Sequence, residues 1–343
     1  MSPMKPWYRH FIGTFLFCGL AVVAAHWVGG WAAVATVLFL TVLETSLSFD
    51  NAVVNAGILA NWNEVWRRRF LTWGMLIAVF GMRLVFPVLI VAVAAGIGPV
   101  KAVLLAVNEP DEYGRALAAA HHQIAAFGGS FLMMVFLRFF VARHKTEHWL
   151  ETLERPLTRL GKLEAIEAAL ALFLVLAASW LIGDEARRGE FVTAGVWGVV
   201  AFILVKGFAA LLGGDEAAAH SHVVKQGAAG FLYLEVLDAS FSFDGVVGAF
   251  AMTHNLLIIA LGLGAGALFV RSFTLLLVER GTLETYRYLE HGAFWAVGAL
   301  AAIMLAGVEF HVPEAITGLI GALLIVFALG SSIRANRKAA HTS

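Results

Sequence analysis

Long apolar segments separated by short polar connections run along the whole chain. A segment of about 20 apolar residues is long enough to cross a bilayer as a helix. The pattern predicts ten such spans, at residues 11–30, 33–58, 71–97, 123–141, 166–183, 192–213, 229–252, 255–278, 291–309 and 313–333. The sequence therefore predicts an all-α fold, a polytopic transmembrane helix bundle that forms one integrated membrane domain.

The basic residues in the connections predict how this bundle is oriented. With the N-terminus inside, sixteen Lys and Arg residues fall on the cytoplasmic side, and only Lys101, Arg115, Arg187 and Arg188 fall on the opposite side. Cytoplasmic connections of membrane proteins carry such an excess of basic residues. We therefore expect both termini to be cytoplasmic.

The first apolar segment admits two interpretations. Lys5 and Arg9 precede an apolar run that ends at Val23-Ala24-Ala25, which is the arrangement of a cleavable signal peptide. The run continues through Trp27 into further apolar sequence, and this favours a first span that is retained. Whether the mature protein keeps residues 1–25 stays open on the sequence.

Composition supports a membrane protein and excludes several other classes. Hydrophobic residues make up 60% of the chain and charged residues 14%, and the mean hydropathy is +0.81, whereas soluble proteins contain about 25% charged residues. The net charge of zero provides no basic field for nucleic acid. The single cysteine, Cys18, excludes an intramolecular disulfide. The predicted partner is the lipid bilayer.

One polar motif occurs twice inside apolar segments. Residues 44–50 (ETSLSFD) are echoed by residues 238–244 (DASFSFD), and Arg83 and Arg271 recur at nearly the same offset. A charged side chain at the centre of the bilayer costs about 2.5–3.5 kcal/mol, so it is seldom present without a function or an oppositely charged partner. The first copy lies on the second predicted span and the second copy on the seventh, an offset of five spans, so the copies run antiparallel. This predicts an inverted five-plus-five repeat, with halves at 1–190 and 191–343 and a polar site between them.

The two motifs supply oxygen ligands for a metal ion. Carboxylate, amide and hydroxyl oxygens suit Mg²⁺, Ca²⁺ and Mn²⁺, and the motifs lack the His and Cys that favour Zn²⁺ or Cu⁺. The predicted ligands are Glu44, Asp50, Asn51, Asp238 and Asp244, with Ser46, Ser48, Glu235, Ser240 and Ser242 as a second tier. Several acids together also allow protons to share the site.

Arg83 and Arg271 are the predicted charge partners of these acids. In an alternative interpretation, the acids only pair with these arginines or with Lys206 to hold helices together, as buried charges in membranes do. The repeated serines and the excess of acids over bases favour the cation site. The cation site and the ion pairs are compatible if the arginines neutralise the acids while no cation is bound.

The serines and the aspartate of each motif are spaced by two residues. This period aligns side chains along an extended backbone and not along a helix. It predicts that both helices unwind at the motif, which would free carbonyl oxygens for a cation. The alternative is that each serine hydrogen-bonds to its own helix and the helix continues.

At these residues the chain resembles the TerC family of bacterial integral membrane proteins, and is similar to a related branch known as a domain of unknown function. TerC proteins carry Glu…Gly-Ile-Asp-Asn early and Asp…Phe…Asp-Ser late. Here Glu44…Ser48-Phe49-Asp50-Asn51 and Asp238…Phe241…Asp244-Gly245 stand in those places. Ser48-Phe49 replaces Gly-Ile, Gly245 replaces Ser, and the predicted span count exceeds the usual one.

The resemblance implies a place in the lysine-exporter superfamily, a link to tellurium resistance, export of Mn²⁺ and location in the bacterial inner membrane. The expected function is therefore a secondary transporter that exports a divalent cation, with Mn²⁺ preferred over Ca²⁺ or Mg²⁺, with no permanently bound cofactor and no enzymatic activity. Two alternatives stay open. One is an intramembrane enzyme that uses paired acids, and the other is a membrane component of a stress complex without transport.

Overall fold

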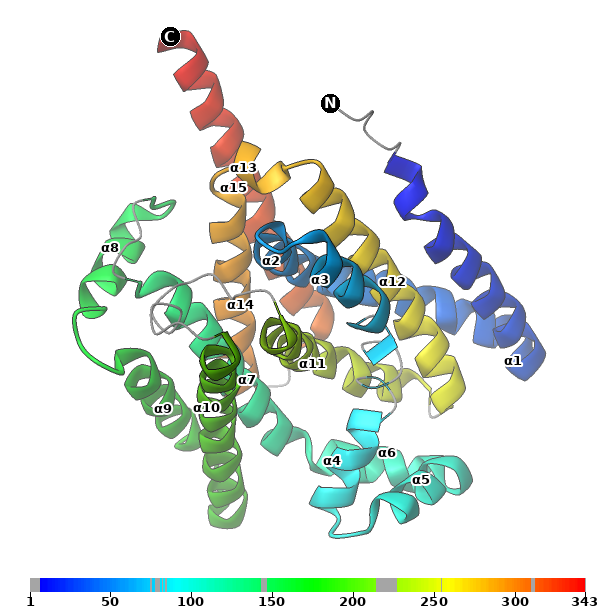
Figure 1. Cartoon of the computed structure of the whole chain (residues 1–343). Helices are drawn as coiled ribbons and strands as arrows, with labels where there is room; N and C mark the ends of the chain where they lie inside the picture. The colour runs from blue at the N-terminus through cyan, green and yellow to red at the C-terminus, as the bar shows by residue number, and fades with distance from the viewer. Residues whose placement is uncertain are drawn as a thin grey trace.

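The computed structural model describes residues 7–74, 76–77, 81, 83, 85–142, 147–213, 227–253, 255–309 and 312–342. Over these ranges the regular structure is helical and no strand occurs, so the predicted all-α bundle is confirmed. Figure 1 shows long helices that cross one another, with short helices at their ends.

The first long helix, α1 (Ile12–Leu47), is bent into two arms. Gly29 and Gly30 have non-helical backbone angles, and Gly30 has a φ of 65°, a conformation that glycine adopts without steric cost. The arms correspond to the first two predicted apolar segments, and Figure 1 shows them meeting in a sharp bend. After a one-residue interruption the second arm continues as α2 (Phe49–Ala60), followed by α3 (Glu64–Arg69).

The third predicted span is helical up to Ala94 at the residues that the structure describes. It begins as the short π-helix η2 (Phe70–Gly74) and ends as α4 (Phe86–Ala94). Residues 98–122, expected as a connection, instead form α5 (Pro99–Asn108) and α6 (Pro110–Ala119). Both helices are too short to appear as apolar runs of about 20 residues. Ala102 and Ala106 of α5 and Tyr113 and Leu117 of α6 are buried against the bundle.

Two helices form the centre of the bundle. Most side chains of α7 (His121–Phe140) and many of α14 (Leu289–Ala306) are buried, and these two helices pack against each other. The remaining elements are η1 (Trp7–His10), α8 (Glu151–Leu160), α9 (Ile166–Ser179), α10 (Glu185–Gly213), α11 (Ala228–Met252), α12 (Leu256–Glu279), α13 (Thr282–Thr285) and α15 (Glu314–Thr342).

The predicted halves 1–190 and 191–343 pack extensively on each other. The most extensive helix pairings join α1 to α12 and α7 to both α10 and α14, and each of these crosses the boundary between the halves. The described chain is therefore one integrated unit. The inverted relation between the halves stays a prediction.

The surface of the bundle fits a membrane environment. Among the described residues, six helices are long and apolar enough to cross a bilayer: Ile12–Leu47, His121–Phe140, Glu185–Gly207, Leu256–Glu279, Leu289–Ala306 and Ile316–Lys338. Large apolar side chains are exposed along α1 and α15. Trp27 and Trp31, beside the bend of α1, and Trp180, at the end of α9, are strongly exposed, as are the aromatic belts of membrane proteins. The chain is a membrane protein, and the count of ten spans stays a prediction.

The connections that are predicted to be cytoplasmic lie apart from those that are predicted to be on the opposite side of the membrane. In Figure 1 the start of α1, the end of α15, α8 and α13 lie toward one end of the molecule, while α5 and α6 lie toward the other. Reporter fusions at positions 65, 150 and 285 are therefore expected to report the same side, the cytoplasm, because the basic residues lie there. A fusion at position 105 should report the opposite side, and a periplasmic signal at position 150 would contradict the topology.

Candidate functional site

The first motif lies where α1 ends and α2 begins. Ser48 interrupts the helix with φ −98° and ψ 19°, but its N–H still donates to the Glu44 carbonyl and its carbonyl accepts from the Ala52 N–H. The helix is therefore kinked and not unwound. The kink changes the rotation between Glu44 and Asp50, and both carboxylates line one cavity.

Glu44 is almost fully buried, at 2% exposure, and has a basic partner. The Arg83 guanidinium forms an ion pair with Glu44 Oε1, and the Ser48 hydroxyl donates to the same oxygen at 3.2 Å. Oε2 faces Gly245 of α11, where a Cβ atom would lie 2.8 Å away. One carboxylate oxygen is thus held by its partners, while the other points toward the second motif. Arg83 is thus the basic partner of Glu44 in the structure.

The cavity between the motifs has a volume of about 30 Å³. Its lining includes Glu44, Ser48, Asp50, Gly245, Thr317 and Gly321. Asp50 is buried, and its Oδ1 accepts the Asn51 N–H at 2.9 Å. Its Oδ2 lies near Gly321 of α15, 3.9 Å from where a Cβ atom would stand. Asp50 has no ion pair with any described residue, so no basic side chain among them neutralises its carboxylate.

The second motif contacts the first through Asp238. Its Oδ1 accepts hydrogen bonds from the side-chain amides of Asn51 and Asn55, each at 2.8 Å. Arg83 and Glu44 lie within electrostatic range of the same carboxylate. The two copies of the motif are therefore in contact through these hydrogen bonds. Asn55 was not predicted, although its spacing of four residues from Asn51 on one helix face is a signal that could have identified it.

Several predicted site residues lie elsewhere. Ser46 is exposed and donates to the Val42 carbonyl at 2.8 Å, and Ser240 donates to the Val236 carbonyl at 3.0 Å. Glu235 is buried outside the cavity lining. The side chains of Ser242 and Asp244 are not among those that the structure describes, so their roles stay predictions.

The predicted unwinding of the second motif is wrong. Helix α11 continues without a break from Ala228 to Met252. The Ser240 hydroxyl donates to the Val236 carbonyl four residues earlier in the same helix. A serine that hydrogen-bonds in this way does not interrupt a regular helix.

Arg271 is half-buried on α12 and is not part of the cavity lining. Gly266, on the same helix, lies against Glu44, where a Cβ atom would stand 2.5 Å from the Glu44 Cβ. The close approach of α12 to α1 therefore depends on glycine at this position.

The described part of the chain contains no group of three or more His, Cys, Asp or Glu side chains that could hold a metal ion. The cavity offers the carboxylates of Glu44 and Asp50, together with the hydroxyls of Ser48 and Thr317. Two carboxylates suit a hard cation that keeps some of its water, because Mg²⁺ is commonly held by one or two carboxylates.

The family of the chain follows from a comparison with protein-family models. Residues 49–339 match the family described as "Protein of unknown function (DUF475)". The chain belongs to this family. The DUF475 match agrees with the domain-of-unknown-function branch suggested by the motifs, and it does not test the wider likeness to TerC. Neither a search of curated proteins nor a search of solved structures found a match.

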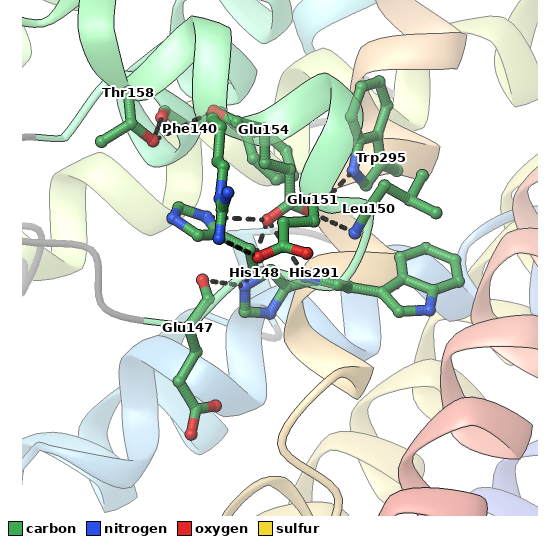
Figure 2. A network of polar contacts seen from close by, with 11 residues as sticks. Phe140, Glu147, His148, Leu150, Glu151, Glu154, Thr158, His291 and Trp295 are labelled. Carbon is green, nitrogen blue, oxygen red and sulfur yellow. Dashed lines mark hydrogen bonds and ion pairs between the residues drawn. The ribbon is translucent and has the colours of Figure 1, made fainter.

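A second polar cluster lies outside the cavity, between α8 and α14. Glu154 of α8 is fully buried and accepts hydrogen bonds from the backbone N–H groups of Trp149 and Leu150 and from Trp295 Nε1, each at 3.2 Å. Figure 2 shows His148 and His291 next to the same carboxylate. Their ring nitrogens lie 3.5 and 3.7 Å from Glu154 Oε2. This cluster fastens the amphipathic helix α8 to the centre of the bundle.

The Glu154→Gln variant is expected to lose about 1.5–3 kcal/mol of stability, because hydrogen bonds to a charged group are worth about that much and a glutamine amide replaces one accepting oxygen with a donor. Denaturation of the purified protein in detergent measures this loss. The exposed Glu164→Gln on the same connection should change stability by less than about 0.5 kcal/mol. Equal stability of the two variants would contradict a fastening role for Glu154.

Proposed function

We propose that this protein is a secondary transporter that moves a divalent metal cation across the membrane. The observation that supports this most strongly is the small cavity where the two motifs meet, lined by Glu44 and Asp50 inside an apolar helical bundle. Buried carboxylates in a membrane helix mark ion pathways or proton relays in many transporters. A cavity at the junction of two repeated elements fits the common transporter plan.

The chemistry of the cavity favours a small hard cation. A volume of about 30 Å³ exceeds the roughly 10–15 Å³ that one water needs, so it accommodates an ion that has lost most of its hydration shell. Carboxylate and hydroxyl oxygens are the ligands that Mg²⁺, Ca²⁺ and Mn²⁺ prefer. Because Arg83 already shares the charge of Glu44, binding is weakened, and this suits an ion that has to leave again.

The choice of ion and direction rests on the resemblance to TerC. It suggests Mn²⁺ as the cargo, export from the cytoplasm as the direction, and the bacterial inner membrane as the location. In this proposal Glu44 and Asp50 are the ligands of the cation. Asp238 holds α2 in place through the amides of Asn51 and Asn55.

Flux measured in reconstituted vesicles tests the proposal. Purified protein in liposomes that contain a metal-sensitive dye is offered Mn²⁺, Mg²⁺, Ca²⁺ or Zn²⁺, with protein-free liposomes as the control. We expect more Mn²⁺ to enter these liposomes than the control. The protein inserts in both orientations, so part of it moves Mn²⁺ from the outside to the inside of the liposome. Absence of flux for every ion, with protein that is folded and correctly inserted, would reject transport in favour of an enzyme or a partner of another complex.

A further inference from the structure

Glu235 is a buried acid that the proposed cation site does not use. It lies on α11 one turn before Asp238 and is 4% exposed. Neither of its carboxylate oxygens has a hydrogen-bond partner within the described chain. The other buried acids differ, because Glu44, Asp50 and Glu154 each accept at least one hydrogen bond.

The surroundings of Glu235 do not stabilise a negative charge. Its Oε1 packs against Gly74 of η2, at 2.5 Å from where a Cβ atom would stand, and Phe70 lies beside the same glycine. Neither residue titrates. Among the described residues, the charged group that acts on Glu235 is Asp238, which is itself an acid. An isolated ionised carboxylate in an apolar site is very costly, so such a group takes up a proton instead.

Glu235 is also connected to the cation cavity. Asp238 lies one turn further along α11 and binds the side chain of Asn51. The backbone N–H of Asn51 binds Asp50, which lines the cavity. A change of charge at Glu235 therefore acts on Asp238 directly and on Asp50 through one intervening residue.

We propose that Glu235 is a proton-binding site whose proton opposes cation binding at Glu44 and Asp50. The inference deepens the proposed transport function and rests on it for the identity of the cation. When Glu235 loses its proton, the added negative charge favours a cation nearby. When Glu235 regains it, the cation is bound less tightly. By linkage the cation equally promotes release of the proton, and an exchange of protons for metal requires this relation.

The first test concerns the proton itself. A folded chain that keeps a proton at Glu235, which the unfolded chain releases above about pH 4.3, loses stability as the pH rises. The melting temperature of the wild type is therefore expected to fall between pH 5 and pH 9. Glu235→Gln imitates the protonated acid, so it should show a smaller fall and a higher melting temperature at pH 9. The exposed Glu185→Gln serves as the matched control and should follow the wild type.

A Glu235→Gln protein that melts lower than wild type at every pH, with an unchanged slope, would overturn the proton site. That outcome would mean that Glu235 is ionised and paired in the folded protein.

The second test concerns coupling to the metal. Mn²⁺ affinity of the wild type is expected to rise with pH, by up to tenfold per pH unit for one released proton, and Glu235→Gln should lose this component. Wild-type pH dependence in Glu235→Gln would overturn the coupling and leave the transport proposal intact. Absence of Mn²⁺ binding in the wild type would instead reject the transport proposal, while the melting curves would still decide whether Glu235 holds a proton.

Discussion

Replacing Asp50 with asparagine is expected to abolish stabilisation by Mn²⁺ while leaving the metal-free protein at least as stable as the wild type. Asp50 is buried, and its Oδ1 accepts a hydrogen bond from the Asn51 N–H. Asparagine keeps the shape and the accepting oxygen. The variant removes a buried charge that no arginine or lysine in the described chain pairs with, so the metal-free fold loses an unfavourable term.

The Asp50→Asn variant is expected to bind Mn²⁺ much more weakly than the wild type. Asp50 is one of two carboxylates that line the cavity, and Coulomb attraction between unit charges at 4 Å amounts to about 4 kcal/mol at an effective dielectric constant of 20. Since 1.4 kcal/mol corresponds to tenfold in affinity, we expect Mn²⁺ to bind at least about 100-fold more weakly. Melting curves of the purified protein across a Mn²⁺ titration report both quantities in one experiment.

Asp184→Asn serves as the control, because it makes the same replacement of aspartate by asparagine at an exposed position. Asp184 is exposed and caps α10 by accepting the Arg187 N–H at 2.9 Å, and asparagine is an equally good cap. Asp184→Asn should therefore keep the wild-type melting temperature and the wild-type response to Mn²⁺. If Asp50→Asn were badly destabilised without metal and still responded to Mn²⁺, Asp50 would be a structural residue and the cation site would be rejected.

The bundle could be predicted from the sequence because long apolar segments leave a helix as the main way to satisfy the backbone in a membrane. Each of the ten predicted ranges contains helix in the described chain. The helices α5 and α6 were missed, since a search for apolar runs of about 20 residues does not detect helices of 10 residues.

The composition of the site was more predictable than its geometry. The repeated acids identified Glu44 and Asp50, but six residues of regular helix would have turned them away from each other. The kink at Ser48 brings both to one cavity. Ser46 was predicted as a ligand because residue spacing does not show which side of a kinked helix faces the partner. Asn55 was missed because it lies outside the repeated motif.

The second large effect is expected from breaking the ion pair between Glu44 and Arg83. Both side chains are almost fully buried, at 3% and 5% exposure. Removing one partner of a buried pair costs about 3–5 kcal/mol, since the other charge stays in a medium that solvates it poorly. Glu44→Gln and Arg83→Met should each destabilise the protein by this amount, which distinguishes Glu44 from Asp50.

The double variant decides whether the loss comes from the pair. Replacing both partners by uncharged groups is often nearly neutral, so Glu44→Gln combined with Arg83→Met should recover much of the stability lost in each single variant. A double-mutant cycle measured by denaturation in mixed micelles isolates this coupling. The exposed pair Glu151 and Arg155, spaced four residues apart on α8, is the control and should show a coupling of only about 0.3–0.5 kcal/mol. Additive losses at Glu44 and Arg83 would mean that each side chain acts through other neighbours, and that Arg83 does not neutralise the empty cavity.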